Sequence, residues 1–184
     1  MKTQKILSIA FFALVFGATS FAQKIVKVGG APMYPTKNII ENAVNSKDHT
    51  TLVAAVKAAG LVETLQSAGP FTVFAPTNEA FSKLPKGTVE SLLKPENLKT
   101  LQTILTYHVV SGRMSSQDIA KAIKMGKGKA TLKTVSGGIL IASMKGKNLI
   151  LTDENGNMSM VTIADVNQSN GVIHVVNAVV TPKS

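Results

Sequence analysis

Residues 71–81 read FTVFAPTNEAF, and residues 171–182 read GVIHVVNAVVTP. The first stretch predicts a buried strand, a corner at Pro76 and the start of a helix. The second stretch predicts a strand that is apolar on both faces and is therefore central in a sheet. His174 lies inside this second strand, where we expect a buried histidine with hydrogen-bond partners.

The remaining periodicity predicts helices first and strands second. Apolar stripes with helical spacing recur between residues 39 and 125, interrupted by a strand at residues 71–74. From residue 131 the period becomes that of strands, and turns containing Gly and Asn separate the short runs. This order is typical of an α+β fold. The expected strands of the last third are 131–135, 139–144, 149–152, 158–163 and 172–180.

The N-terminal segment is predicted to be a targeting sequence. Two lysines precede an apolar run at residues 6–17, and the small residues that follow predict cleavage before Gln23. The run is shorter than the ~20 residues that span a membrane. We therefore expect residues 1–22 to be a signal peptide and the protein to be secreted or periplasmic. Residues 23–35 contain two Gly and two Pro and are expected to form an N-terminal arm outside the core.

The composition limits the classes of partner and of chemistry. Without the signal peptide the chain has 162 residues, of which 18 are basic and 10 acidic, and its net charge is +8. There is no cysteine, so thiolate metal sites and thiol nucleophiles are excluded. The positive charge favours contact with anionic glycans, lipid headgroups or acidic proteins, and nucleic acid is not expected in that compartment. The alternative is that the lysines only maintain solubility.

Tyr107-His108 lies between the two stretches quoted above. The three features together resemble the two sequence boxes and the central Tyr-His pair of the fasciclin domain, a family of secreted and cell-surface adhesion modules. The resemblance implies one fasciclin-like domain at residues 36–182, a wedge-shaped β-sandwich with helices packed to one side. It also implies a non-enzymatic adhesion or interaction module of the cell envelope or extracellular matrix, with cell-surface or matrix proteins as partners and no membrane-spanning segment.

The same resemblance implies candidate partner-binding residues. In animal members of the family the Tyr-His pair is assigned to integrin binding, which would place Tyr107 and His108 in a recognition site. Asp165-Val166 aligns with an Asp-Ile pair to which the same role is assigned. The residues themselves support another interpretation. His108 continues the apolar stripe of the preceding helix, as a buried core histidine does, and an Asp before a Gly-containing turn commonly caps backbone N–H groups.

Lysines are concentrated between residues 121 and 147, and only one acidic residue lies between residues 111 and 148. This pattern indicates an anion-binding surface, and with it an alternative function, a ligand-binding module that captures an anionic glycan or lipid. The other interpretation is a solvated charged surface without a ligand. The candidate anion-binding residues are Lys121, Lys124, Lys127 and Lys129.

The sequence predicts no catalytic residue, metal ligand or cofactor. The run Asp153-Glu-Asn-Gly-Asn157 resembles a calcium loop, but its glycine is at the fourth position instead of the sixth, and the twelfth residue is alanine. The three histidines lack metal-ligand spacing, and no phosphate-binding loop or nucleophile elbow occurs. An exported hydrolase would need an acid–base pair, which ten scattered acidic residues do not supply. We therefore expect a monomeric, non-enzymatic protein.

Overall fold

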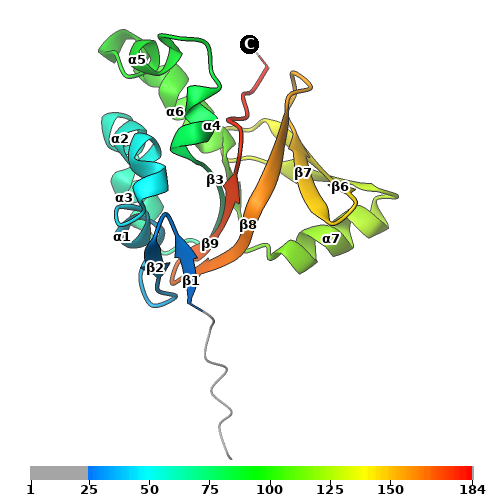
Figure 1. Ribbon diagram of the computed structural model, residues 1–184. Helices are drawn as coiled ribbons and strands as arrows, with labels where there is room; N and C mark the ends of the chain where they lie inside the picture. Colours follow the sequence, from blue (N-terminus) through cyan, green and yellow to red (C-terminus); the bar gives the residue numbers. More distant parts are fainter. Residues whose placement is uncertain (1–24, 184) are drawn as a thin grey trace, which may run out of the picture.

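The computed structural model describes residues 25–183 (Figure 1). The predicted signal peptide at residues 1–22 lies outside the described residues. A seven-stranded sheet runs through the described chain. Helices α1 to α6 pack beside strands β3 and β9, and α7 packs against β5 and β6 (Figure 1). This combination of helices and a sheet confirms the α+β class predicted from the sequence.

Several helices begin at side-chain caps that the sequence supplies. Asn38 and Ser115 each accept a hydrogen bond from the backbone three residues on, where an acidic side chain bonds back, so α1 and α7 start with capping boxes. Thr77 caps α4. The helices are α1 (Ile39–Ala43), α2 (Thr50–Ala58), α3 (Val62–Gln66), α4 (Asn78–Ser82), α5 (Thr88–Leu92), α6 (Leu98–Tyr107) and α7 (Ser116–Met125), with short 3₁₀ turns η1 (Lys47–His49) and η2 (Pro95–Asn97).

The sheet places the two stretches that mark the fold side by side. Its order is β4-β3-β9-β8-β7-β6-β5, and β3 and β9 are parallel neighbours in which Phe74 stands opposite His174. All six residues of β9 are buried, as predicted for a central strand. The strands of this sheet are β3 (Phe71–Pro76), β4 (Val109–Ser111), β5 (Lys129–Lys133), β6 (Ile139–Lys145), β7 (Asn148–Thr152), β8 (Met158–Gln168) and β9 (Gly171–Val176).

Strand β8 joins the two halves of the sheet, β4-β3-β9 and β7-β6-β5. It pairs with β7 along its first part and with β9 along the rest, and two register shifts between Val161 and Val166 interrupt the second pairing. Bulges of this kind bend a strand and increase its twist. A bridge from Val110, in β4, to Thr134, just after β5, then brings the two edges of the sheet together. The sheet is therefore nearly closed.

Two hydrophobic cores lie on opposite faces of the sheet. One includes Ile173 and Val175 with residues of α1 to α6, and the other includes Val176 and Phe74 with residues of α7 and β5 to β7. Consecutive residues of a strand point to opposite faces. Strand β9 therefore supplies side chains to both cores, which is the reason why every one of its residues is buried.

The N-terminal segment corrects one prediction from the sequence. Val26–Val28 (β1) and Ala31–Met33 (β2) form an antiparallel hairpin, and Val28 and Met33 are buried in the first core. Gly29 and Gly30 both have positive φ, the condition for the tight two-residue turns of β-hairpins. The prediction that residues 23–35 form an arm outside the core is thus wrong for the hairpin, because the two glycines make a turn and not a flexible leader.

Candidate interaction sites

Tyr107, the last residue of α6, is fully buried. Its hydroxyl donates a hydrogen bond to the carbonyl oxygen of Ile139 (2.6 Å) and accepts one from the backbone N–H of Glu154 (3.2 Å). A Cβ atom at Gly138 would lie 2.6 Å from the Tyr107 ring. Any side chain at position 138 would therefore displace the tyrosine ring. Burial raises the pKa of Tyr107 to about 12. The side chain therefore ties α6 to β6 and to the turn after β7.

His108 follows α6 and is also buried, with 3% of its surface exposed. Its Nδ1 atom lies 2.8 Å from the Ile104 carbonyl oxygen, and its Nε2 atom accepts a hydrogen bond from the N–H of Val180 (3.1 Å). These partners assign a neutral ring with its proton on Nδ1. Burial lowers the pKa of His108 to about 4. The interpretation of His108 as a buried, hydrogen-bonded histidine is confirmed.

Asp165 lies in the second bulge of β8, with a positive φ of 58°. Its carboxylate accepts hydrogen bonds from the backbone N–H (2.7 Å) and the hydroxyl of Ser116, the first residue of α7. Its own N–H donates to Nδ1 of His174 (3.3 Å), whose Nε2 donates to the Met114 carbonyl oxygen (2.9 Å). Burial lowers the pKa of His174. Asp165 thus caps backbone, as the second interpretation of this residue expected, and it fixes α7 to the sheet.

The four predicted partner-binding residues do not form one exposed site. Tyr107, His108 and Val166 are buried, and only Asp165 is partly exposed. His108 and Val166 line the same interior cavity, whereas Asp165 faces the start of α7. A partner could contact the three buried side chains only if the fold opened. Their role in partner binding stays a prediction.

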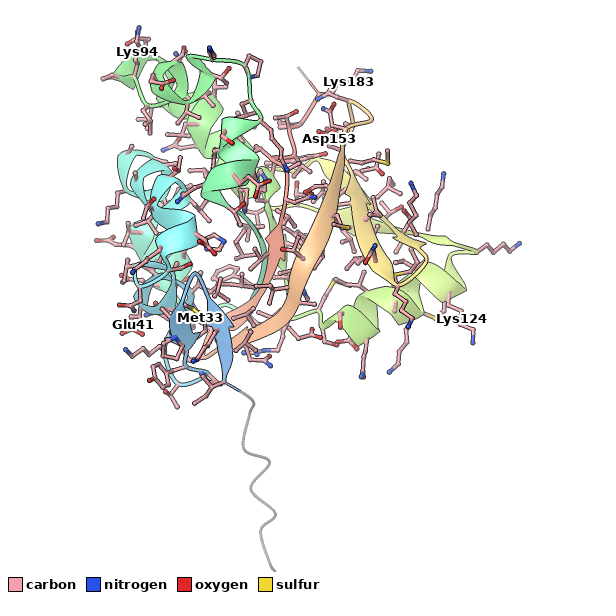
Figure 2. All side chains as sticks on the ribbon, in the orientation of Figure 1. Met33, Glu41, Lys94, Lys124, Asp153 and Lys183 are labelled. Carbon is pink, nitrogen blue, oxygen red and sulfur yellow. The ribbon has the colours of Figure 1, made fainter. Side chains whose placement is uncertain are left out.

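The predicted anion-binding residues are all exposed. Lys121 and Lys124 lie on α7, and Lys127 and Lys129 follow in the turn and at the start of β5. We call these four residues the lysine surface. Figure 2 shows Lys124 on α7 pointing outward, away from the part of the molecule where Lys94 lies. Within residues 25–183 the one ion pair joins Lys83 to Glu79, so none of the four lysines forms an ion pair there. Hydrogen bonds from Ser115 lower the pKa of the Asp118 carboxyl, and Lys121 lies near enough to add to this effect.

The calcium-like run at Asp153 has a structural explanation. The Asp153 carboxylate accepts hydrogen bonds from the backbone N–H groups of Asn155 (2.9 Å), Asn157 (2.8 Å) and Thr181 (2.9 Å). It thereby holds the turn between β7 and β8 against the C-terminal segment. Among the described residues no group of three His, Cys, Asp or Glu side chains is placed to hold a metal ion. In the same part of the chain, no helix has the length and apolar character needed to cross a membrane.

Two buried polar residues were not identified from the sequence. Asn170 accepts a hydrogen bond from the N–H of Ile39 (3.0 Å) and donates to the carbonyl oxygens of Leu65 and Ser67 (2.8 Å each). His49 is buried beside an apolar cavity. Neither position stands out in sequence, because the partners of Asn170 are more than 100 residues away and His49 belongs to a short 3₁₀ turn.

Comparison with known proteins confirms the resemblance described above. The fasciclin domain family matches residues 47–182. Protein sll1483 of Synechocystis sp. is 44% identical over 164 residues, which cover 87% of this chain and 82% of that protein. Transforming growth factor-beta-induced protein ig-h3 of Sus scrofa is 38% identical over 148 residues, 80% of this chain but only 20% of that protein.

A solved structure shows the same fold. It is that of a FAS1 domain pair from the insect cell adhesion molecule Fasciclin I, with a TM-score of 0.68 and 17% sequence identity. The alignment covers 77% of this chain and 50% of the solved chain, as expected if one of the two domains is matched. With a family match over most of the described residues and relatives above 30% identity, the chain belongs to the fasciclin domain family.

Proposed function

We propose that this protein is an exported, non-enzymatic adhesion or interaction module of the cell envelope or extracellular matrix. The observation that carries the proposal is its membership of the fasciclin domain family, which includes a solved domain pair from a cell adhesion molecule. Export after cleavage before Gln23 belongs to the same proposal. Partner proteins of the cell surface or matrix then bind exposed residues, because Tyr107 and His108 are engaged inside the fold.

Adhesion is tested with beads that carry the chain from Gln23 onward. We expect such beads to bind cells, or proteins of an envelope extract, from the organism that produces the protein. Beads carrying the same chain after irreversible unfolding serve as the control, since a binding surface made by the fold is lost on unfolding. Equal binding by folded and unfolded chain, or none by either, would contradict the proposal.

A second candidate function rests on the lysine surface. Four exposed lysines that form no ion pair among the described residues favour the capture of an anionic glycan or lipid. We expect the chain to bind heparin and vesicles rich in phosphatidylserine. Both interactions should weaken as salt rises, because the Debye length is about 8 Å at physiological ionic strength. Binding is measured by titration at several salt concentrations.

Substitution of Lys121, Lys124, Lys127 and Lys129 by Gln should weaken vesicle binding at least tenfold, since each lysine near an anionic membrane contributes about 1 kcal/mol. The matched control replaces Lys57, Lys86, Lys94 and Lys99, which are also exposed but lie on the helical side. Both variants lose the same net charge. An equal loss in the two variants would show a general charge effect, and it would remove the lysine surface as a site.

A further inference from the structure

An apolar cavity lies between the helices and the sheet. It has a volume of about 70 Å³, and its lining comes from α1, α2, α3, α6, β3 and β9 and from the N-terminal hairpin. Figure 1 shows these helices beside β3 and β9. Exposed Thr64 and Val135 also line the cavity, so it approaches the surface there.

One polar atom of the lining lacks a partner. His49 has 3% of its surface exposed, and its Nδ1 atom lies 2.8 Å from the Ser46 hydroxyl oxygen. Its Nε2 atom is buried and has no hydrogen bond to any described residue. Burial lowers the pKa of His49; the Ala75 backbone opposes this shift but does not complete a hydrogen bond. His108, which lines the same cavity, has partners for both of its ring nitrogens.

Water is a poor occupant of this space. A buried water usually makes two to four hydrogen bonds, whereas purely apolar cavities stay dry. Besides His49, the buried or partly buried polar side chains of the lining are Ser46, Thr106 and His108, whose polar atoms are already hydrogen-bonded. A water at Nε2 would therefore have one good partner and hydrocarbon around it. A molecule that is itself mostly hydrocarbon matches the lining better.

We propose that the cavity binds a short, uncharged alkyl chain that carries one hydroxyl group, with the hydroxyl on His49 Nε2. A hydroxyl both donates and accepts, so it satisfies Nε2 whichever ring nitrogen carries the proton. A charged group is disfavoured, since the lining contains no acidic or lysine side chain to compensate its burial. The cavity is about half the size of the ~150 Å³ apolar cavity that holds benzene, so the ligand it encloses is smaller than benzene.

The probes are ethanol, ethane and acetate, which share a two-carbon skeleton, differ at one end and are smaller than benzene. Methyl resonances of the lining residues report entry into the cavity, and the ¹⁵N resonance of His49 Nε2 reports the hydrogen bond. We expect ethanol and ethane to shift the methyl signals and acetate to leave them unchanged. Only ethanol should shift the Nε2 signal. Two outcomes overturn the proposal: neither neutral probe enters, or a long-lived water at Nε2 is not displaced by ethanol.

Variants separate the hydrogen bond from the space. His49→Phe should lower the affinity for ethanol relative to ethane about fivefold, which corresponds to one net hydrogen bond. Ala43→Leu, which fills the cavity and keeps His49, should abolish binding of both probes. Its matched control is Ala58→Leu, on the exposed face of α2. An unchanged affinity ratio in His49→Phe, or full binding in Ala43→Leu, overturns the proposal. If His49→Phe does not fold, the wild-type Nε2 signal still decides.

Discussion

Replacing His108 by alanine is expected to lower the free energy of unfolding by about 3 kcal/mol at pH 7. The substitution removes a buried ring and leaves the Ile104 carbonyl and the Val180 N–H without their present partners. Unsatisfied buried polar groups and lost packing both destabilise the folded state. Urea unfolding followed by circular dichroism measures the difference.

The destabilisation by His108→Ala is expected to shrink to about 1 kcal/mol at pH 5. The pKa of His108 is about 4 in the fold against a reference value of 6.5, so the unfolded chain binds this proton first. Wild-type stability therefore falls as the pH drops through the window from about 6.5 to about 4. One pH unit in this window changes the free energy by about 1.4 kcal/mol, which gives about 2 kcal/mol at pH 5. The alanine variant lacks the group, so the two proteins converge.

Tyr107→Phe is the matched control for this pH dependence. It removes only the hydroxyl and its two hydrogen bonds, and the tyrosine has a pKa of about 12, far above the tested range. The loss of unfolding free energy caused by Tyr107→Phe should be equal at pH 5 and pH 7. A pH-independent effect of His108→Ala would contradict the buried neutral ring. An unchanged stability together with lost partner binding would instead support recognition by His108.

Replacing Asn170 by aspartate is expected to cost about 4 kcal/mol at pH 7. The Asn170 amide nitrogen donates to the carbonyl oxygens of Leu65 and Ser67 in a site that is 6% exposed. A carboxylate would place a negatively charged acceptor against these two oxygens and would supply no donor. The helical segments before β3 would lose their attachment to the turn before β9. Urea unfolding measures the loss of stability. Acidification should recover part of it, because the protonated carboxyl group of the aspartate has one O–H donor.

Asn167→Asp is the control, because the same chemical change falls three residues earlier, near the end of β8. The Asn167 side-chain oxygen accepts a hydrogen bond from Arg113 (3.2 Å), so a carboxylate there gains a charged partner. We expect its stability to stay within about 0.5 kcal/mol of wild type. The stability of Asn170→Ala should lie between those of Asn170→Asp and Asn167→Asp, since this substitution removes the hydrogen bonds without adding a charge. A tolerated Asn170→Asp would mean that the amide does not hold the helices.

Local pattern predicted most of the elements correctly. The strand predicted at residues 71–74 is observed as β3, and the helical pattern predicted up to residue 125 ends there with α7. The strand predicted at residues 172–180 is observed as β9, which ends earlier, at Val176. Strand β4 was missed because it has only three residues and follows a helix directly. Strand β8 is longer than predicted, since its second half contains polar residues that a period-two pattern does not identify.

The candidate sites were less predictable. Exposure of the lysine surface follows from composition and helical spacing, and the structure agrees. Nearby residues explain the roles of Tyr107 and His108 only in part. His108 bonds to Ile104, four residues before it, but its second partner is Val180, and Tyr107 bonds to Ile139. The sequence therefore left two interpretations of His108 open. The choice between a core histidine and a recognition residue depends on hydrogen-bond partners that lie close to His108 only in the folded chain.

The sequence by itself determined the α+β order of elements, the central place of residues 171–176 and the family, because hydrophobic periodicity, turn residues and caps act over a few positions. Only the tertiary structure decided which polar groups are satisfied. His108 Nε2 finds the N–H of Val180, 72 residues away, whereas the buried Nε2 of His49 finds no partner among the described residues. Both rings are histidines in apolar surroundings. Their difference arises from the packing of distant segments, since a hydrogen bond requires an atom within about 3 Å and local sequence does not encode that position.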